Sequence, residues 1–177
     1  SIMEKSKSAR KHWDKKVRPE NRSVDNLSIK KKNINELRSL GFTNAHIAPK
    51  HGIFRGQTGI INLKDKPKPI KSSVAQVIDF RYREKGKRTY PRSLLGLIAH
   101  IRQNFYDSEW YLKAQEVFEE YPAENEPLSS NISLESLGMS RTLNKPFIFI
   151  TANENYSDKA INIANEFNLN TWILGSG

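Results

Sequence analysis

The feature that most constrains the fold is a strand–helix–strand unit near the end of the 177-residue chain. Pro146–Thr151 holds a nearly continuous apolar run, Phe-Ile-Phe-Ile, which is typical of a parallel strand covered on both faces. A helix is predicted next, with Ser157 or Asp158 as its cap, from apolar residues at three- and four-residue spacing: Ala160, Ile161, Ala164 and Phe167. Thr171–Leu174 is predicted as a second buried strand. Strand, helix and strand in fewer than thirty residues form a βαβ crossover, so the chain is predicted to be an α/β protein with parallel strands.

A second pattern, between Tyr90 and Tyr111, predicts a long amphipathic helix. Pro91 is expected in its first turn, where the missing N–H costs nothing. The apolar face is formed by Leu94, Leu95, Ile98, Ile101 and Phe105. Helices of this kind pack on sheets in many proteins, so the pattern indicates structure and not function.

The rest of the chain predicts shorter elements. Residues 1–28 are polar and basic with no periodic face, and are expected to form an arm. A short helix is expected to end at Gly41, a residue suited to the left-handed position after a helix. The other predicted elements are strands at 42–48, 58–63 and 74–80, a turn-rich loop at 51–56, a proline-containing connector at 64–69, an acidic linker at 121–131 and a helix at 132–143 capped by Asn131.

Composition excludes some classes of protein. The chain is long enough for one domain with a sizeable core. It has no cysteine, which excludes disulfides and thiolate metal sites, and no apolar run long enough to cross a membrane.

The net charge of +10 raises the alternative of a basic module that binds nucleic acid or another polyanion. The positive charge comes in short blocks at Lys5–Lys16, Lys30–Lys32, Lys64–Lys71 and Arg81–Arg88, beside loop-forming residues. No block is interleaved with aromatic residues, and none matches a zinc finger, helix-turn-helix or RNA-recognition motif. Solvated basic loops therefore explain the charge more simply.

Several motifs occur in one order along the chain: Trp-Asp-Lys-Lys-Val-Arg-Pro-Glu at 13–20, Glu-Leu-Arg-Ser-Leu-Gly-Phe-Thr at 36–43, His-Gly-Ile-Phe-Arg-Gly at 51–56, the segment 91–111, Asn-Glu-Phe-Asn-Leu at 165–169 and Leu-Gly-Ser-Gly at 174–177. Together they resemble bacterial proteins of the amidohydrolase superfamily, in its imidazolonepropionase-like branch. The resemblance extends from about Trp13 to Gly177.

This resemblance implies a (β/α) barrel with one or two divalent metals at the carboxyl ends of its strands, which activate water to hydrolyse non-peptide carbon–nitrogen bonds. A barrel needs typically about 250 residues. The expected fold is therefore a partial (β/α) barrel over residues 29–177, incomplete at both ends, in a longer bacterial protein that is exported if a signal precedes Ser1. The expected partners are the remainder of the barrel or a second amidohydrolase-like half, with zinc and a small-molecule substrate in the full-length parent.

The family's metal ligands are missing from the matching positions. The chain contains no His-x-His, Thr151 and Asn153 stand where a strand of the family ends in His-Ala-His, and Gly175 or a neighbour replaces a further histidine. Since neutral imidazole is the usual ligand for such metals, the segment is expected to hold no metal and to be catalytically degenerate.

A few residues are candidates for a site of their own. His46, His51 and Arg55 are catalytic candidates for a small hydrolase, and Thr151 and Asn153 are candidates for binding a polar substrate. Each has a structural alternative. His46 could fill a gap in the core, Arg55 could clamp an anion or tie its loop to the arm, and Asn153 could cap a helix.

Overall fold

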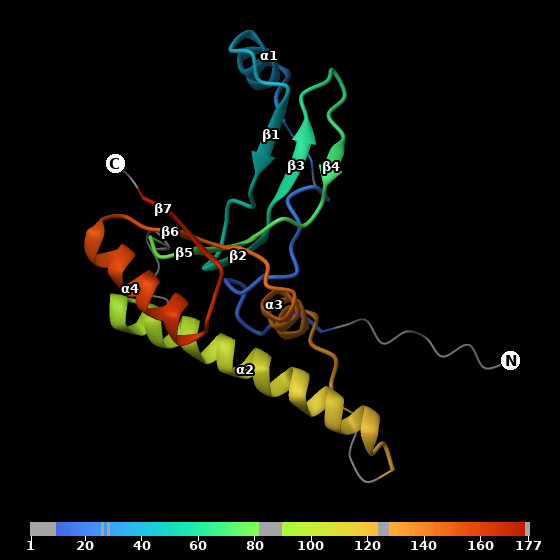
Figure 1. The fold of residues 1–177 in the computed structure, drawn as a ribbon, viewed down its shortest axis with the longest axis vertical. Helices are drawn as coiled ribbons and strands as arrows, with labels where there is room; N and C mark the ends of the chain where they lie inside the picture. Colours follow the sequence, from blue (N-terminus) through green and yellow to red (C-terminus); the bar gives the residue numbers. More distant parts are fainter. Residues whose placement is uncertain (1–9, 26, 28, 82–89, 124–127, 176–177) are drawn as a thin grey trace, which may run out of the picture.

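The computed structural model describes residues 10–25, 27, 29–81, 90–123 and 128–175, which form a mixed α/β structure with two sheets (Figure 1). The helices are α1 (Lys31–Ser39), α2 (Leu94–Glu120), α3 (Ile132–Thr142) and α4 (Glu154–Glu166). The strands are β1 (Asn44–Ile47), β2 (Phe54–Gln57), β3 (Gly59–Asn62), β4 (Pro69–Lys71), β5 (Gln76–Asp79), β6 (Phe147–Ile150) and β7 (Thr171–Leu174). Neither sheet closes into a barrel. No helix in the described ranges is long and apolar enough to cross a membrane.

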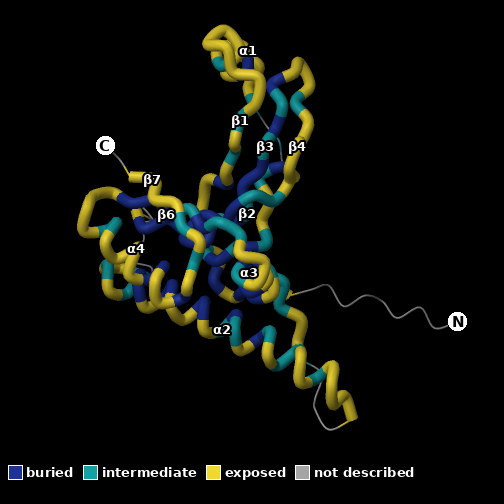
Figure 2. The backbone as a smooth tube through the Cα atoms, viewed as in Figure 1, coloured by how far each residue is buried: buried dark blue, intermediate teal, exposed yellow. Residues whose placement is uncertain are grey.

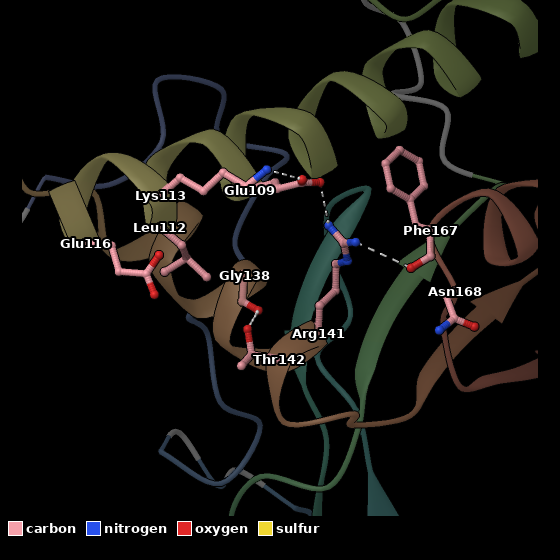
Figure 3. A pocket seen from close by; sticks show the side chains of 9 residues that line it. All are labelled: Glu109, Leu112, Lys113, Glu116, Gly138, Arg141, Thr142, Phe167 and Asn168. Atoms are coloured by element: carbon pink, nitrogen blue, oxygen red, sulfur yellow. Dashed lines mark hydrogen bonds and ion pairs between the residues drawn. The ribbon is translucent and has the colours of Figure 1, made fainter.

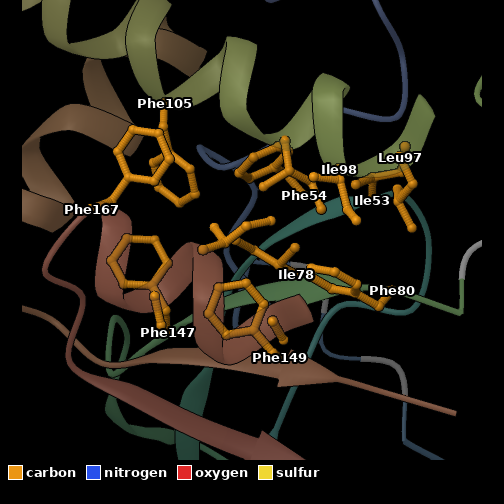
Figure 4. Packing of buried hydrophobic residues seen from close by; sticks show 14 of the residues in the cluster. Ile53, Phe54, Ile78, Phe80, Leu97, Ile98, Phe105, Phe147, Phe149 and Phe167 are labelled. Carbon is orange, nitrogen blue, oxygen red and sulfur yellow. The ribbon is translucent and has the colours of Figure 1, made fainter. Parts of the chain in front are cut away.

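The main sheet has the order β2-β5-β6-β7, with β5, β6 and β7 parallel and β2 antiparallel to β5. Helices α2, α3 and α4 pack on one face of this sheet, and the large apolar cluster lies between them (Figures 1 and 4). Phe105 of α2 is fully buried there and contacts the rings of Phe54, Phe147 and Phe167. The predicted βαβ unit is present as β6–α4–β7.

A small lobe, formed by α1 and the antiparallel sheet β1-β3-β4, stands out from the main body (Figure 1). Its own core is a separate cluster of Val24, Ile34, Ile61 and Leu63. Residues 30–50 and 59–71 contain nine Lys or Arg and two Asp or Glu, a net charge of +7. The small lobe therefore carries most of the charge of the chain.

The described part of the basic segment, residues 10–25, lies along β2 and is part of the body. It forms isolated bridges to β2 at Val17 and Arg22 and to Asn131 at Arg10, and Val17 is fully buried in the main core. The carbonyl oxygen of Pro19 accepts hydrogen bonds from the side chains of three residues on different elements: Gln57, Gln76 and Ser136. Main-chain contacts thus fix a segment that has no periodic pattern in the sequence.

Several local features differ from the sequence predictions. Helix α4 is capped by Asn153 and not by Ser157 or Asp158. Residues 51–56 contain the start of β2 and are not only a loop. The long helix begins after Ser93, whose side chain accepts a hydrogen bond from the Gly96 amide, and Pro91 lies before it after a cis peptide bond. Strand β7 was predicted to be buried, but Trp172 is 48% and Leu174 57% exposed. Figure 2 shows this exposed edge.

Candidate functional site

The carboxyl ends of β5, β6 and β7 meet at one edge of the main sheet, where α/β proteins commonly place their functional groups. At this edge Asp79 ends β5, and its side chain is only 6% exposed. Its Oδ2 pairs with the Arg55 guanidinium, and its Oδ1 accepts a hydrogen bond from the Arg81 amide at 2.8 Å and lies 3.5 Å from Arg81 Nε. Two cations therefore neutralise the one buried carboxylate.

Thr151 follows β6 at the same edge and is fully buried. Its Oγ1 shares a hydrogen bond of 2.8 Å with Ser157 Oγ, and a Cβ added at Gly175 would lie 3.9 Å from it. The two positions where the resemblance expects histidines are thus neighbours. Asn153 caps α4, since its side chain accepts a hydrogen bond from the Tyr156 amide at 3.1 Å.

A hollow of about 760 Å³ opens at these strand ends, with Asn153, Ser157, Asp158 and Gly175 among its lining residues. Two of its polar side chains are engaged elsewhere: Asn153 caps α4 and Ser157 bonds to Thr151. The hollow can take a polar molecule, and the one hydroxyl among the described residues that line it, that of Ser157, is bonded to Thr151 Oγ1.

His46, His51 and Arg55 do not come together in one hollow. His46 lies on β1 of the small lobe, away from the parallel strands, and its Nε2 is 2.7 Å from Thr58 Oγ1. Burial lowers the pKa of His46. His51 is exposed and lines a different hollow, at the base of α1, whereas Arg55 pairs with Asp79. Arg55 is therefore a structural cation rather than a clamp open to an anion.

The residues at the strand ends do not fit a divalent metal. A metal site needs several oxygen or nitrogen ligands without competing cations. Asp79 has two guanidinium groups beside it, and the described residues contain no group of three His, Cys, Asp or Glu side chains that could hold a metal.

A third hollow, of about 390 Å³, lies among α2, α3 and the end of α4 (Figure 3). Three of its charged side chains pair with one another: Glu109, Lys113 and Arg141. Glu109 accepts hydrogen bonds from Lys113 at 2.8 Å and Arg141 at 3.4 Å, and these contacts lower the pKa of Glu109. Arg141 also lies over the Phe167 ring, 5.4 Å from its centroid. This network joins the helices and leaves little for a ligand.

Sequence reasoning missed Asp79 and its pairing with Arg55 and Arg81. The signal was present in the predicted strand 74–80, where Asp79 is the one charged residue of an otherwise apolar or uncharged run. A carboxylate in a strand that is buried at every position must have a partner.

Comparison with known proteins gives a likeness of fold. No protein-family model matches the sequence, and no curated protein matches it. The solved structure of an amidohydrolase from Thermotoga maritima MSB8 matches with a TM-score of 0.71 and 22% sequence identity. The match covers 89% of this chain and 43% of that chain, so this chain spans less than half of its structural neighbour.

Proposed function

We propose that this chain is a structural, catalytically degenerate segment of an amidohydrolase-like hydrolase that acts on non-peptide carbon–nitrogen bonds. The observation that carries the proposal is the match over 89% of the chain to an amidohydrolase fold, at a TM-score of 0.71. The order of the sequence motifs supports the same family, and its imidazolonepropionase-like branch is part of the proposal.

The strand ends support the degenerate role. Where the family would hold a metal, this chain places the hydroxyl of Thr151, the helix cap Asn153 and an aspartate neutralised by two arginines. The chain's own residues stabilise the edge of the sheet there, and we assign the chemistry to another part of the parent protein.

The open side of the main sheet supports a partner. Strand β7 pairs only with β6 in the described sheet, and its residues Trp172 and Leu174 are about half exposed. Unpaired strand edges and exposed apolar side chains mark surfaces that other chains or segments cover. The proposed occupant is the remainder of the barrel or a second amidohydrolase-like half.

Zinc binding tests the degenerate role. The purified chain is dialysed against trace zinc, analysed for metal and titrated with zinc by calorimetry. We expect no stoichiometric zinc. One tightly held zinc per chain would refute the proposal, and loss of that zinc in His46→Ala or His51→Ala would identify these histidines as ligands.

Binding of nucleic acid or another polyanion is a second candidate, favoured by the net charge of +7 on the small lobe. Phosphate contacts release counterions, so such binding weakens steeply as salt rises. Fluorescence anisotropy with labelled oligonucleotides over a series of salt concentrations measures this slope. The slope of the logarithm of the binding constant against the logarithm of salt concentration counts the released ions. A slope that corresponds to several ions, and that falls when Lys31 and Lys32 are replaced by alanine, would favour this second function.

A further inference from the structure

The hollow at the base of α1 differs in its chemistry from the two hollows described above at the strand ends and among α2, α3 and α4. It has a volume of about 620 Å³, within the usual range of ligand pockets of about 300–1,000 Å³. Three parts of the chain form its walls: residues 21–23, residues 47–51 at the end of β1 and just after it, and four residues at the start of α1 and before it, Leu27, Ile29, Lys30 and Asn33. We refer to it as the basic hollow.

Its charge is unbalanced. The described residues that line it include Arg22, Lys30, Lys50 and His51 and no Asp or Glu. Arg22 pairs with Asp25 at 2.9 Å, but within the described chain neither Lys30 nor Lys50 makes an ion pair or a side-chain hydrogen bond. In the hollow of about 390 Å³, by contrast, lysine and arginine share a glutamate. Two ammonium groups without counter-charges on one concave surface favour an anion.

Part of its wall is apolar. Leu27, Ile29 and Ile47 line the hollow and pack, half-buried, against the core of the small lobe. Ligand pockets commonly combine such an apolar surface with a few polar groups that fix orientation. A ligand that fits both parts has an anionic group and a carbon skeleton.

Hydrogen bonds and close packing hold two of the three walls in place. Ser23 Oγ donates a hydrogen bond to the Ile47 carbonyl at 3.2 Å, which joins two of the three segments. His51 precedes Gly52, which has a φ of +109°, and a Cβ there would lie 2.8 Å from the Lys16 carbonyl oxygen. The same oxygen accepts the Ile53 amide at 2.9 Å. The position of His51 is therefore set by the segment 10–25.

From these contacts we infer that the basic hollow binds a small organic anion, with its phosphate or carboxylate at Lys30, Lys50 and His51 and its carbon skeleton on Leu27, Ile29 and Ile47. This site is separate from the strand-end edge of the main sheet and does not depend on the proposed hydrolase family.

Calorimetric titration of the chain with phenyl phosphate, benzoate and inorganic phosphate at constant ionic strength tests the inference. We expect saturable binding of one molecule of phenyl phosphate or benzoate, and the tighter of the two identifies the anionic group. Lys50→Ala and Lys30→Ala are each expected to weaken binding about tenfold, as loss of a charge-assisted contact does. Lys66→Ala is the matched control, because Lys66 is an exposed lysine of the same lobe that does not line the hollow.

Circular dichroism establishes that each variant is folded. Absence of saturable binding to the unmodified chain would overturn the inference. So would an equal loss in Lys66→Ala, because general attraction to a basic lobe would then explain the binding. Equal affinity for inorganic phosphate and phenyl phosphate would refute the role of the apolar wall. In a competition titration, an oligonucleotide that displaces phenyl phosphate, and whose own binding Lys50→Ala and Lys66→Ala weaken equally, would overturn the inference. That result would show that the basic surface binds a polyanion.

Discussion

Replacing Gly56 by alanine tests whether the segment 10–25 is a fixed part of the body. Gly56 has a φ of +114°, and a Cβ there would lie 2.1 Å from the Asn21 carbonyl oxygen and 2.8 Å from that of Arg18. The segment cannot simply turn away, because the Gln57 amide donates to the same Asn21 oxygen at 2.7 Å. Alanine must therefore displace the segment from β2.

The expected loss has two parts. A side chain at positive φ costs about 1–2 kcal/mol, and forcing an extra carbon into a packed site costs about 1–3 kcal/mol. The Gly56→Ala variant should lose about 2–5 kcal/mol, a large share of a typical stability of about 5–15 kcal/mol. Gly41→Ala is the control, since Gly41 has a φ of +88° but no atom within 4 Å of an added Cβ. The Gly41→Ala variant should lose only the stability that a side chain at positive φ costs, about 1–2 kcal/mol.

Urea denaturation followed by far-ultraviolet circular dichroism measures both losses. The difference between the two variants isolates the contact with the segment. If Gly56→Ala loses no more stability than Gly41→Ala, the segment does not pack against Gly56 in solution and the reasoning fails.

Three further perturbations test other parts of the structure. Burial lowers the pKa of His12 and His100 below the ordinary 6.5, although the Asp14 carboxylate opposes the shift for both. Their contribution to stability is then complete above about pH 6.5 and is lost as the pH falls through the lower pKa of the folded chain. Urea denaturation at one pH above about 6.5 and one pH well below it should show this loss of unfolding free energy. His100→Gln should make the stability depend less on pH, and an unchanged pH dependence would contradict the assignment. Asp79→Asn leaves the Arg55 guanidinium buried without its counter-charge and should cost about 3–5 kcal/mol in the same assay, whereas a loss near zero would mean that the pair is open to water. Trp172→Lys should raise the soluble fraction in a sedimentation assay without changing the circular dichroism, because lysine discourages pairing at an exposed edge; an unfolded variant would show that Trp172 is part of the core.

Local patterns predicted the elements whose contacts are close in sequence. The β6–α4–β7 unit follows from apolar spacing over residues 146–174, and Asn131 caps α3 as predicted, accepting hydrogen bonds from the Ser133 and Leu134 amides. The apolar spacing of α4 and the Asn131 cap depend on neighbours a few residues away. Features of this kind can therefore be predicted from the spacing of residues in the sequence.

The parts that could not be predicted depend on distant contacts. The segment 10–25 is fixed by main-chain bonds to β2. Gly52 and Gly56 both have a positive φ and lie where that segment passes too close for a side chain, a contact that no local pattern shows. Strand β7 has the composition of a buried strand, yet no described element covers its outer side. In the candidate site, Thr151 and Gly175 lie side by side, as expected from the order of the motifs. The pairing of Arg55 with Asp79 spans 24 residues, and no pattern in the sequence indicates it.

The attachment of the segment 10–25 has a consequence for how the chain folds. The His12 amide donates to Ser133 Oγ across 121 positions of sequence, and Arg10 bridges to Asn131. At a synthesis rate of about 5–20 residues per second, the early residues wait roughly 6–24 s for these partners to leave the ribosome. Contacts of such long range form late, since closing a large loop costs entropy before any bond repays it. We therefore expect the helices and parallel strands to assemble first, and the segment that shapes one wall of the basic hollow to dock last.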